Sequence, residues 1–502
     1  MPINQAYAFM HKYSVVFLFF IIFILGVSCN QNPEKEHKVV KEDISQKNET
    51  HLNKIRKTGK IVAATDFNSH GYFIYRGTPM GFQYELLNSY ADHLGVNLEI
   101  LVENELTKSL EYIQENKCDL LAMDLAITSD RKKKMMFTNP IYQSRQVLVQ
   151  KLPENWRKMR TWDEIESHLI RDAIDLEGET VHITKGSVFY NRLNHINIET
   201  GVGIQIVEEE KPVDELIKEV ADGEIKFTIC DNHVGSINKK YYRNIDIETT
   251  LSSYSQNLAW ALPLESDSLL KDINQWLDSY KKSKEFYFVY NKYFKNSRTT
   301  RMAKSEYYSY SGSKISPYDG LIKKYAKKIH WDWRLLASLI YQESKFNPDA
   351  ESWTGAFGLM QMMPETAEQY DVNDTSSPED QIEAGTRYIN LIDRQLEPLV
   401  NDSLERRKFV MASYNAGLAH VLDAQRLAKK YDKNPERWDN NVDYYLLNKS
   451  KPKYYKDTVV YYGYCRGSEP YNYVNEIYSR YQHYINLINE KLEVPVDSIV
   501  NK

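Results

Sequence analysis

Residues 342–367 read QESKFNPDAESWTGAFGLMQMMPETA, and this stretch decides the fold of the second half of the chain. Just before it, Leu339 and Ile340 are spaced so that Glu343 shares their face of a helix, because residues three and four apart stack together. Asp332 is a suitable N-cap for this helix. Desolvation on an apolar face raises the pKa of an acid, so Glu343 is predicted to hold a proton near neutral pH. The alternative is an ordinary glutamate at a helix end.

The residues after Glu343 favour a site over that alternative. Gly355 and Gly358 have no side chains and let the backbone approach a bulky ligand closely. Gln361 offers an amide that both donates and accepts hydrogen bonds. Pro364 then ends the segment before a new helix.

This segment resembles the catalytic region of the Slt-type lytic transglycosylases, whose pattern includes Glu-Ser-x-Phe-x-Pro, Ser-x-x-Gly-Ala-x-Gly-Leu-Met-Gln and Met-Pro-x-Thr-Ala. Two further blocks follow in the family's order, ASYNAG at 412–417 and EPYNYV at 469–474, where Pro470 replaces the usual Thr. The resemblance implies that Glu343 is the catalytic acid and that the remaining motif residues bind the glycan. These are Ser352, Gln361, Tyr414, Asn415 and Tyr473. Each of the five is alternatively a core or capping residue.

The resemblance also implies the reaction, which is non-hydrolytic cleavage of the β-1,4 bond between N-acetylmuramic acid and N-acetylglucosamine. The substrate's acetamido group assists departure of the leaving sugar, and Glu343 then deprotonates the C6 hydroxyl to give a 1,6-anhydro end. Two alternatives stay open. One is a hydrolytic muramidase, which requires a second carboxylate such as Glu351 or Glu365. The other is a non-catalytic envelope sensor that only binds the wall.

Length and composition restrict the other possibilities. The chain has 502 residues, enough for two or three domains, and a net charge of -5, which argues against a nucleic-acid partner. Apart from Cys29, only Cys118, Cys230 and Cys465 remain, and three scattered cysteines make neither a disulfide framework nor a metal cluster. No metal and no diffusible cofactor are expected.

The N-terminus is predicted to be a targeting segment. Residues 15–27 form a run of apolar or small residues, too short for a comfortable membrane-spanning helix, and Ser28 and Cys29 follow at once. Residues 25–29 look like a loose lipobox, so residues 1–29 are predicted to be a lipoprotein signal peptide with Cys29 lipidated. Plain secretory cleavage is the alternative. We expect an envelope protein anchored by lipid, on the outer membrane facing the periplasm, with translation starting at Met1 or Met10.

The remaining domain boundaries follow from composition and periodicity. Residues 30–51 are predicted to be a flexible tether, 52–295 an α/β domain with mainly parallel sheets, 296–316 a linker, 317–490 an all-α lysozyme-like domain and 491–502 a tail. Strands are predicted at 61–65, 98–102, 120–126, 146–150, 181–184, 227–230 and 258–262. Helices are predicted at 84–94, 317–329, 333–343, 364–370, 378–396, 404–415, 417–430 and 470–490.

The α/β domain resembles the family 3 solute-binding proteins, which close two lobes on a polar amino acid. The resemblance rests on GFQYELL at 81–87, ADHLG at 91–95, ITSDR at 127–131, FTNPIY at 137–142 and CDN at 230–232. It implies that the pocket residues are Thr128, Arg131, Gly186, Ser187 and Asp231, with Arg131 on the ligand's carboxylate and Asp231 on its ammonium. Asp124 stands where the family commonly has Gly, which adds a negative charge near the pocket.

The alternatives are a structural ion pair for Arg131 and a helix N-cap for Asp231. Because the module continues into a second domain, we expect a regulator that binds an amino acid or muropeptide, not a transport shuttle. The two-domain order as a whole resembles the membrane-bound lytic murein transglycosylases of the F type.

Overall fold

The computed structural model describes residues 50–251, 254–295 and 314–488. The predicted signal peptide with Cys29, nearly all of the tether, most of the linker and the C-terminal tail lie outside the described residues. No helix among the described residues combines the length and the apolar character that crossing a membrane requires.

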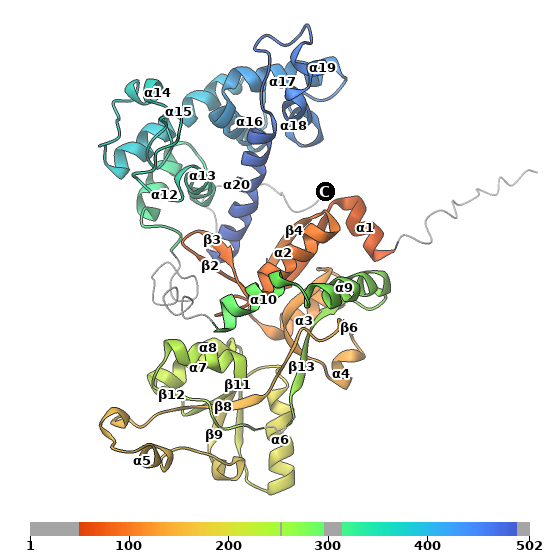
Figure 1. The fold of residues 1–502 in the computed structure, drawn as a ribbon, viewed down its shortest axis with the longest axis vertical. Helices are drawn as coiled ribbons and strands as arrows, with labels where there is room; N and C mark the ends of the chain where they lie inside the picture. The colour runs from red at the N-terminus through yellow and green to blue at the C-terminus, as the bar shows by residue number, and fades with distance from the viewer. Residues whose placement is uncertain (1–49, 252–253, 296–313, 489–502) are drawn as a thin grey trace, which may run out of the picture. The chain divides into compact units, whose positions relative to one another are not determined.

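Residues 50–295 form two α/β lobes (Figure 1). The sheet of the first lobe has the strand order β4-β1-β5-β13-β6, and β7 also pairs with β13. The chain enters the second lobe after β7 and returns to the first lobe with β13. The elements of the first lobe are α1 (His51–Thr58), β1 (Lys60–Thr65), β2 (Phe73–Tyr75), β3 (Thr78–Met80), α2 (Phe82–Leu94), β4 (Asn97–Val102), α3 (Leu106–Gln114), β5 (Leu120–Ala126), α4 (Ser129–Lys132), β6 (Met136–Phe137), β7 (Tyr142–Ser144), β13 (Gln256–Leu262), α9 (Asp267–Tyr280), α10 (Lys284–Tyr290) and the π-helical turn η4 (Asn291–Lys295).

The second lobe is a sheet of order β10-β9-β11-β8-β12 with helices on both faces (Figure 1). Along β8 the side chains alternate, so Leu148 packs in the cluster with α6 while Val147 and Val149 pack in the cluster with α7 and α8. Its elements are β8 (Gln146–Lys151), η2 (Trp156–Lys158), α5 (Trp162–Glu166), η3 (Ala173–Leu176), β9 (Thr180–Thr184), α6 (Phe189–Thr200), β10 (Gln205–Glu209), α7 (Val213–Asp222), β11 (Phe227–Asp231), α8 (Asn232–Tyr241) and β12 (Ile245–Asp246).

All seven predicted strands are present, but the expectation of mainly parallel sheets is wrong, because both sheets mix parallel and antiparallel pairs. Strand β1 pairs parallel with β4 and β5, and β9 pairs parallel with β10 and β11. The strands beyond them, β13 with its neighbours and β8 with its neighbours, pair antiparallel. A buried strand has the same apolar sequence in either direction, so periodicity could not reveal this.

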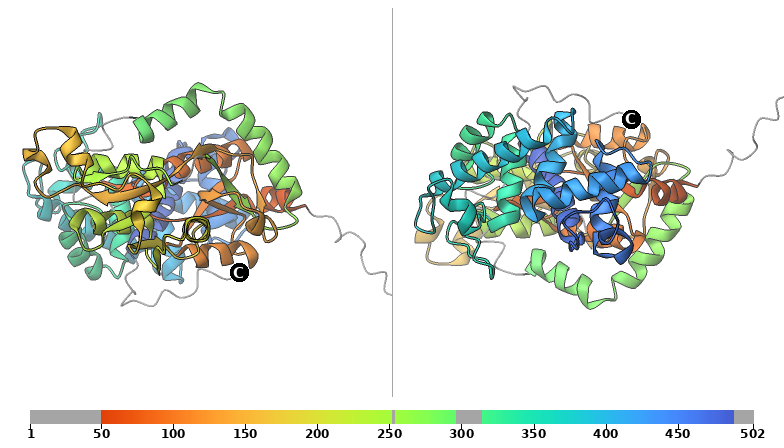
Figure 2. Two further views of the ribbon diagram at one scale, coloured as in Figure 1. Left: turned by 90° about the horizontal axis from the view of Figure 1, so that it is seen from below. Right: turned by 90° about the horizontal axis from the view of Figure 1, so that it is seen from above.

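Residues 319–487 are built from helices, coloured cyan to blue in Figures 1 and 2, around one buried core. The predicted helices are all present, and the shorter turns of residues 438–455 add to them. The helical elements are α12 (Asp319–Lys328), α13 (Trp333–Ser344), α14 (Pro364–Glu368), α15 (Pro378–Leu396), α16 (Ser403–Ala416), α17 (Leu418–Lys430), η5 (Trp438–Val442), α18 (Asp443–Leu447), η6 (Asn448–Ser450), α19 (Pro452–Tyr455) and α20 (Ser468–Leu487).

The hairpin of β2 and β3, which the sequence did not predict, contacts this helical core. Ile74 belongs to the same buried cluster as the side chains of α13 and α20. Thr78 Oγ1 lies 2.6 Å from Tyr341 Oη on α13, and Tyr484 Oη on α20 donates to the Gly77 carbonyl at 2.9 Å. Tyr72, just before β2, shares a hydrogen bond of 2.7 Å with His483 on α20.

Candidate active site and ligand cleft

Glu343 lies in the last turn of α13, as predicted. Asp332 is the N-cap, and its carboxylate accepts a hydrogen bond from the Arg334 backbone N–H. Leu339 and Ile340 are fully buried, while Glu343 itself is half-buried. The helix therefore holds an acid at the border between an apolar core and solvent.

Helix α20 supplies the partner of this acid. The Tyr473 hydroxyl donates to Glu343 Oε1, and α20 is held against α13 by the Ser338 hydroxyl, which donates to the Ile477 carbonyl at 2.7 Å. Burial raises the pKa of Glu343 to about 7, against a smaller lowering by the Tyr473 hydrogen bond. Near neutral pH a substantial fraction of Glu343 is therefore protonated, as a general acid requires.

Helix α16 carries Tyr414 near the acid. The Tyr414 hydroxyl donates to the Met360 carbonyl at 2.7 Å, which ties α16 to the loop after Glu343. Burial and the charge of Glu343 together raise the pKa of Tyr414 well above its ordinary value, so this hydroxyl stays protonated. Asn415 is the next residue and is exposed, with its amide available to a ligand.

The loop of residues 345–363 is held by its own hydrogen bonds. Gln361 has φ 44°, and its amide nitrogen donates to the carbonyls of Ala350 at 2.9 Å and Gly358 at 3.0 Å. The Ser352 hydroxyl accepts from the Ala356 N–H at 2.9 Å. The amide nitrogen of Gln361 is therefore used within the loop.

Gly355 and Gly358 are glycines for different structural reasons. Both have positive φ, but a Cβ at Gly358 would lie 2.6 Å from Gln381 Oε1, whereas nothing lies within 4 Å of a Cβ at Gly355. Gly358 is thus required by packing within the protein, and only Gly355 leaves open space for a ligand. Trp353, in the same loop, is 97% exposed and offers a free aromatic face.

Among the described residues, no second carboxylate shifts the pKa of Glu343. The pKa of Glu343 is set by burial and the Tyr473 hydrogen bond, and Glu343 is the carboxylate that acts on the buried Tyr414 and Tyr473 hydroxyls. Glu351, one of the two predicted rivals, is exposed, and so is Glu365.

The second candidate site is a cleft in the α/β domain, lined by residues of both lobes. Three of the five predicted pocket residues line the cavity, namely Arg131, Ser187 and Asp231. Thr128 instead caps α4, and Gly186 provides a backbone carbonyl next to the cavity.

Two charged groups of this cavity, Arg131 and Asp231, form no ion pair within the described part of the chain. The Arg131 guanidinium donates to the backbone carbonyls of Ala126 at 3.1 Å and Gly186 at 3.3 Å, with no carboxylate at ion-pair distance, and burial lowers its pKa to about 10. Asp231 is the N-cap of α8 by position, but its side chain makes no capping bond and its Oδ1 has no partner. Burial raises the pKa of Asp231, and that of Asp66 in the same cavity, to about 6.

His70, His233 and Asp66 stand at the same cavity or beside it and were not predicted from the sequence. Asp66 and His70 follow β1 in the first lobe, and His233 follows β11 in the second lobe. In each sheet the crevice beyond the carboxyl ends of parallel strands is where ligands bind, so these positions were a usable signal.

Comparisons with known protein families agree with this two-part architecture. Residues 60–296 match the bacterial extracellular solute-binding proteins, family 3, and residues 320–436 match the transglycosylase SLT domain. The structure of holo ArgBP from T. maritima superposes on 48% of this chain and 99% of that chain, with a TM-score of 0.39 and 22% identity.

Two relatives are similar along most of their length. A membrane-bound lytic murein transglycosylase F of Desulfosudis oleivorans is 33% identical over 432 residues, which are 85% of this chain and 90% of that protein. Another, of Aeromonas salmonicida, is 32% identical over 449 residues, which are 88% of this chain and 85% of that protein. The chain therefore belongs to the membrane-bound lytic murein transglycosylase F family, as an envelope lyase that joins a binding-protein-like α/β domain to a helical SLT domain.

Proposed function

We propose that Glu343 alone performs the acid and base steps of peptidoglycan cleavage and that the product carries a 1,6-anhydro end. Glu343 gives its proton to the glycosidic oxygen, the bond from C1 to that oxygen breaks, and the substrate's acetamido oxygen bonds to C1. The Glu343 carboxylate then takes the proton of the C6 hydroxyl, and O6 displaces the acetamido oxygen from C1. The acid is restored and no water is consumed.

The observation that carries this proposal is the environment of Glu343. A pKa near 7 lets the same group donate a proton in the first step and accept one in the second. The usual two-carboxylate schemes need a partner about 5 to 10 Å away, whereas among the described residues burial and Tyr473 shift the pKa of Glu343 and no second carboxylate does. The Tyr473 hydroxyl stabilises the carboxylate formed between the two steps.

The neighbouring polar groups supply the binding contacts in this proposal. The Gln361 amide oxygen and the Ser352 hydroxyl hydrogen-bond the glycan, and the exposed Asn415 amide orients the acetamido group for attack on C1. The buried Tyr414 holds the loop after Glu343 in place through Met360.

Matched amide variants of the carboxylates test the assignment. Glu343→Gln is expected to abolish the release of muropeptides from purified peptidoglycan, while Glu351→Gln and Glu365→Gln keep most of it. A Glu343→Gln variant with parental turnover would refute the proposal. Loss in Glu351→Gln or Glu365→Gln as well as in Glu343→Gln would indicate the hydrolytic two-carboxylate route.

A second proposal concerns the cavity of the α/β domain, which we infer binds a small zwitterion such as a free amino acid or the stem of a muropeptide. The support is an unpaired cation and an unpaired carboxylate in one cavity, since Arg131 suits a carboxylate and Asp231 suits an ammonium. Calorimetry with amino acids and wall peptides tests it. Arg131→Met is expected to abolish the heat of binding, and binding unchanged in that variant would contradict the assignment.

The route from this domain to catalysis is the hairpin of β2 and β3. Thr78 contacts Tyr341, which lies two residues before Glu343, and Gly77 contacts Tyr484 on the helix that carries Tyr473. A ligand that shifts the first lobe would therefore act on both members of the Glu343–Tyr473 pair.

Anchoring by lipid at Cys29, on the outer membrane facing the periplasm, completes the proposed function. The apolar run before Cys29 supports it. Cys29→Ser is expected to move the protein from the membrane fraction to the soluble envelope fraction. A variant that stays in the membrane fraction would contradict the lipid anchor.

A further inference from the structure

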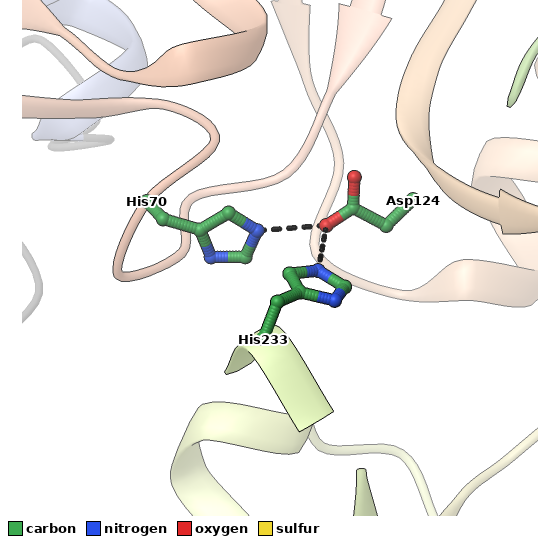
Figure 3. Close-up of side chains that lie close together, drawn as sticks. All are labelled: His70, Asp124 and His233. Carbon is green, nitrogen blue, oxygen red and sulfur yellow. Dashed lines mark hydrogen bonds and ion pairs between the residues drawn. The ribbon is translucent and has the colours of Figure 1, made fainter. Parts of the chain in front are cut away.

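Three side chains that are far apart in the sequence converge in the cleft of the α/β domain (Figure 3). His70 comes from the loop after β1, and Asp124 comes from β5, the middle strand of the first lobe's sheet. His233 comes from the first turn of α8 in the second lobe. The cluster therefore spans the two lobes.

The geometry of the cluster fits a small cation. His70 Nε2 lies 2.7 Å and His233 Nε2 lies 3.0 Å from the same oxygen, Asp124 Oδ2, and the three atoms all lie within 4.8 Å of one another. Zinc binds imidazole nitrogen and carboxylate oxygen at about 2.0–2.2 Å, which places neighbouring ligand atoms about 3.3 Å apart in a tetrahedron. Small side-chain movements would bring the three atoms to that spacing.

The other carboxylate oxygen of Asp124 is fixed by hydrogen bonds. Asp124 Oδ1 accepts from Gln83 Nε2 at 2.5 Å and from the Tyr142 hydroxyl. Gln83 is fixed in turn, because its Oε1 accepts from the indole N–H of Trp260 at 2.7 Å. Outer contacts of this kind orient a carboxylate ligand and leave Oδ2 to face the two histidines.

Hydrogen bonds fix the orientation of the His233 ring. His233 Nδ1 lies 3.0 Å from Ser144 Oγ on one side, and on the other side His233 Nε2 lies 3.0 Å from Asp124 Oδ2 and 3.3 Å from Tyr142 Oη. Ser144 therefore orients the ring so that Nε2 faces Asp124.

The surrounding cavity carries an excess of negative charge. Asp66, Asp214 and Asp231 line it together with Asp124, against the guanidinium of Arg131 and the imidazole of His70 among the lining residues. A cation at the cluster would offset this excess.

We propose that His70 Nε2, Asp124 Oδ2 and His233 Nε2 bind one divalent transition-metal ion, for which zinc is the best fit, with a further coordination position open to the cavity. Two imidazoles and a carboxylate favour zinc over magnesium or calcium, which prefer all-oxygen sites. Because the ligands come from both lobes, the ion joins the lobes and holds the cleft closed. The open position takes an oxygen or nitrogen of the cleft's ligand.

The sequence did not predict this metal site, because no two of the three ligands lie within 50 residues of each other in the chain. Metal motifs recognised from sequence have closely spaced pairs of ligands. Asp124, the residue that departs from the solute-binding proteins, is the centre of the cluster.

Zinc itself is the probe for the experiment. The full-length chain is stripped of metal with a chelator, and Zn²⁺ is then titrated in competition with a chromophoric chelator. One Zn²⁺ per chain is expected. His233→Gln is expected to weaken binding by at least about 100-fold, and Ser144→Ala, which removes an outer contact, by about 10- to 100-fold. His195→Gln, at an exposed histidine of α6, is the matched control and binds zinc like the parent.

Two measurements keep the test decisive if a variant folds poorly. Zinc is expected to raise the melting temperature of the parent chain, and X-ray absorption of the zinc-loaded parent is expected to show two imidazole nitrogens. No stoichiometric zinc binding by the parent, or equal affinity in His233→Gln and His195→Gln, would overturn the proposal. Binding of a free amino acid by a parent chain that takes no zinc would assign the cluster to an ammonium group instead.

Discussion

Removing the hydroxyl of Tyr473 is expected to move the pH dependence of catalysis in a calculable direction. In Tyr473→Phe the hydrogen bond to Glu343 Oε1 is lost while the ring remains in its place on α20. This bond lowers the pKa of Glu343, and burial raises it. Without the bond the pKa must therefore rise above about 7.

The size of the change follows from the two protonation states. A hydrogen bond to a charged group is worth about 1.5–3 kcal/mol and one to a neutral group about 0.5–1.5 kcal/mol, so the carboxylate loses about 1–1.5 kcal/mol more than the acid. At 1.36 kcal/mol per tenfold change, the pKa rises by about one unit. Since Glu343 must be protonated to start the reaction, the falling alkaline limb of kcat/KM should move from near pH 7 to about pH 8.

The assay is release of soluble muropeptides from purified peptidoglycan between about pH 5 and pH 9. Tyr471→Phe is the matched control, because Tyr471 is a half-buried tyrosine on the same helix, whereas the hydrogen bond to Glu343 comes from Tyr473. The control should keep the parental profile. An alkaline limb that stays in place in Tyr473→Phe, or moves to lower pH, would refute the link between this hydroxyl and the acid.

Three further predictions concern stability. Burial raises the pKa of Glu343 from 4.5 to about 7, so the protonated side chain stabilises the fold fully below pH 4.5 and this contribution is lost as the pH approaches 7. In urea unfolding, Glu343→Gln should therefore leave the free energy of unfolding unchanged in acid and raise it by up to about 3 kcal/mol above pH 7. No gain at pH 8 would contradict this. Gly77→Ala would place a Cβ 2.5 Å from a tyrosine hydroxyl of the helical domain, so it should lower the free energy of unfolding by about 1–3 kcal/mol and also lower kcat. Gly95 has a similar φ but nothing within 4 Å of its Cβ position, so Gly95→Ala should lower the free energy of unfolding by about 1 kcal/mol and leave kcat unchanged. Equal effects of the two glycine variants on kcat would exclude the hairpin as a route to the active site. Asp423→Asn leaves the fully buried Lys449 ammonium without its carboxylate and should cost about 3–5 kcal/mol in thermal or urea unfolding, and a loss under 1 kcal/mol would show that the pair contributes little.

Local features were predictable from the sequence. The helix of Glu343 was predicted because its apolar spacing and its N-cap at Asp332 lie within one short segment. The hairpin of β2 and β3 was not, because its strands have three residues each and its turn, Arg76-Gly77, has positive φ at both positions but lacks the usual Asn or Asp. Pro79 within β3 argued further against a strand.

Non-local features were predictable only where a family motif preceded them. Glu343 and Tyr473 are 130 residues apart, and only the order of the family motifs predicted that they belong to one site. His70 and His233 belong to no motif, and their convergence on Asp124 depends on how two lobes close, which spacing along the chain cannot encode.

Digestion of peptidoglycan in ¹⁸O-enriched water, followed by mass spectrometry of the fragments, tests whether Glu343 cuts the glycan without water. We predict muramic acid ends that are one water lighter than reducing ends and carry no ¹⁸O. Reducing ends that have incorporated ¹⁸O would contradict the single-carboxylate mechanism and assign the reaction to a hydrolase.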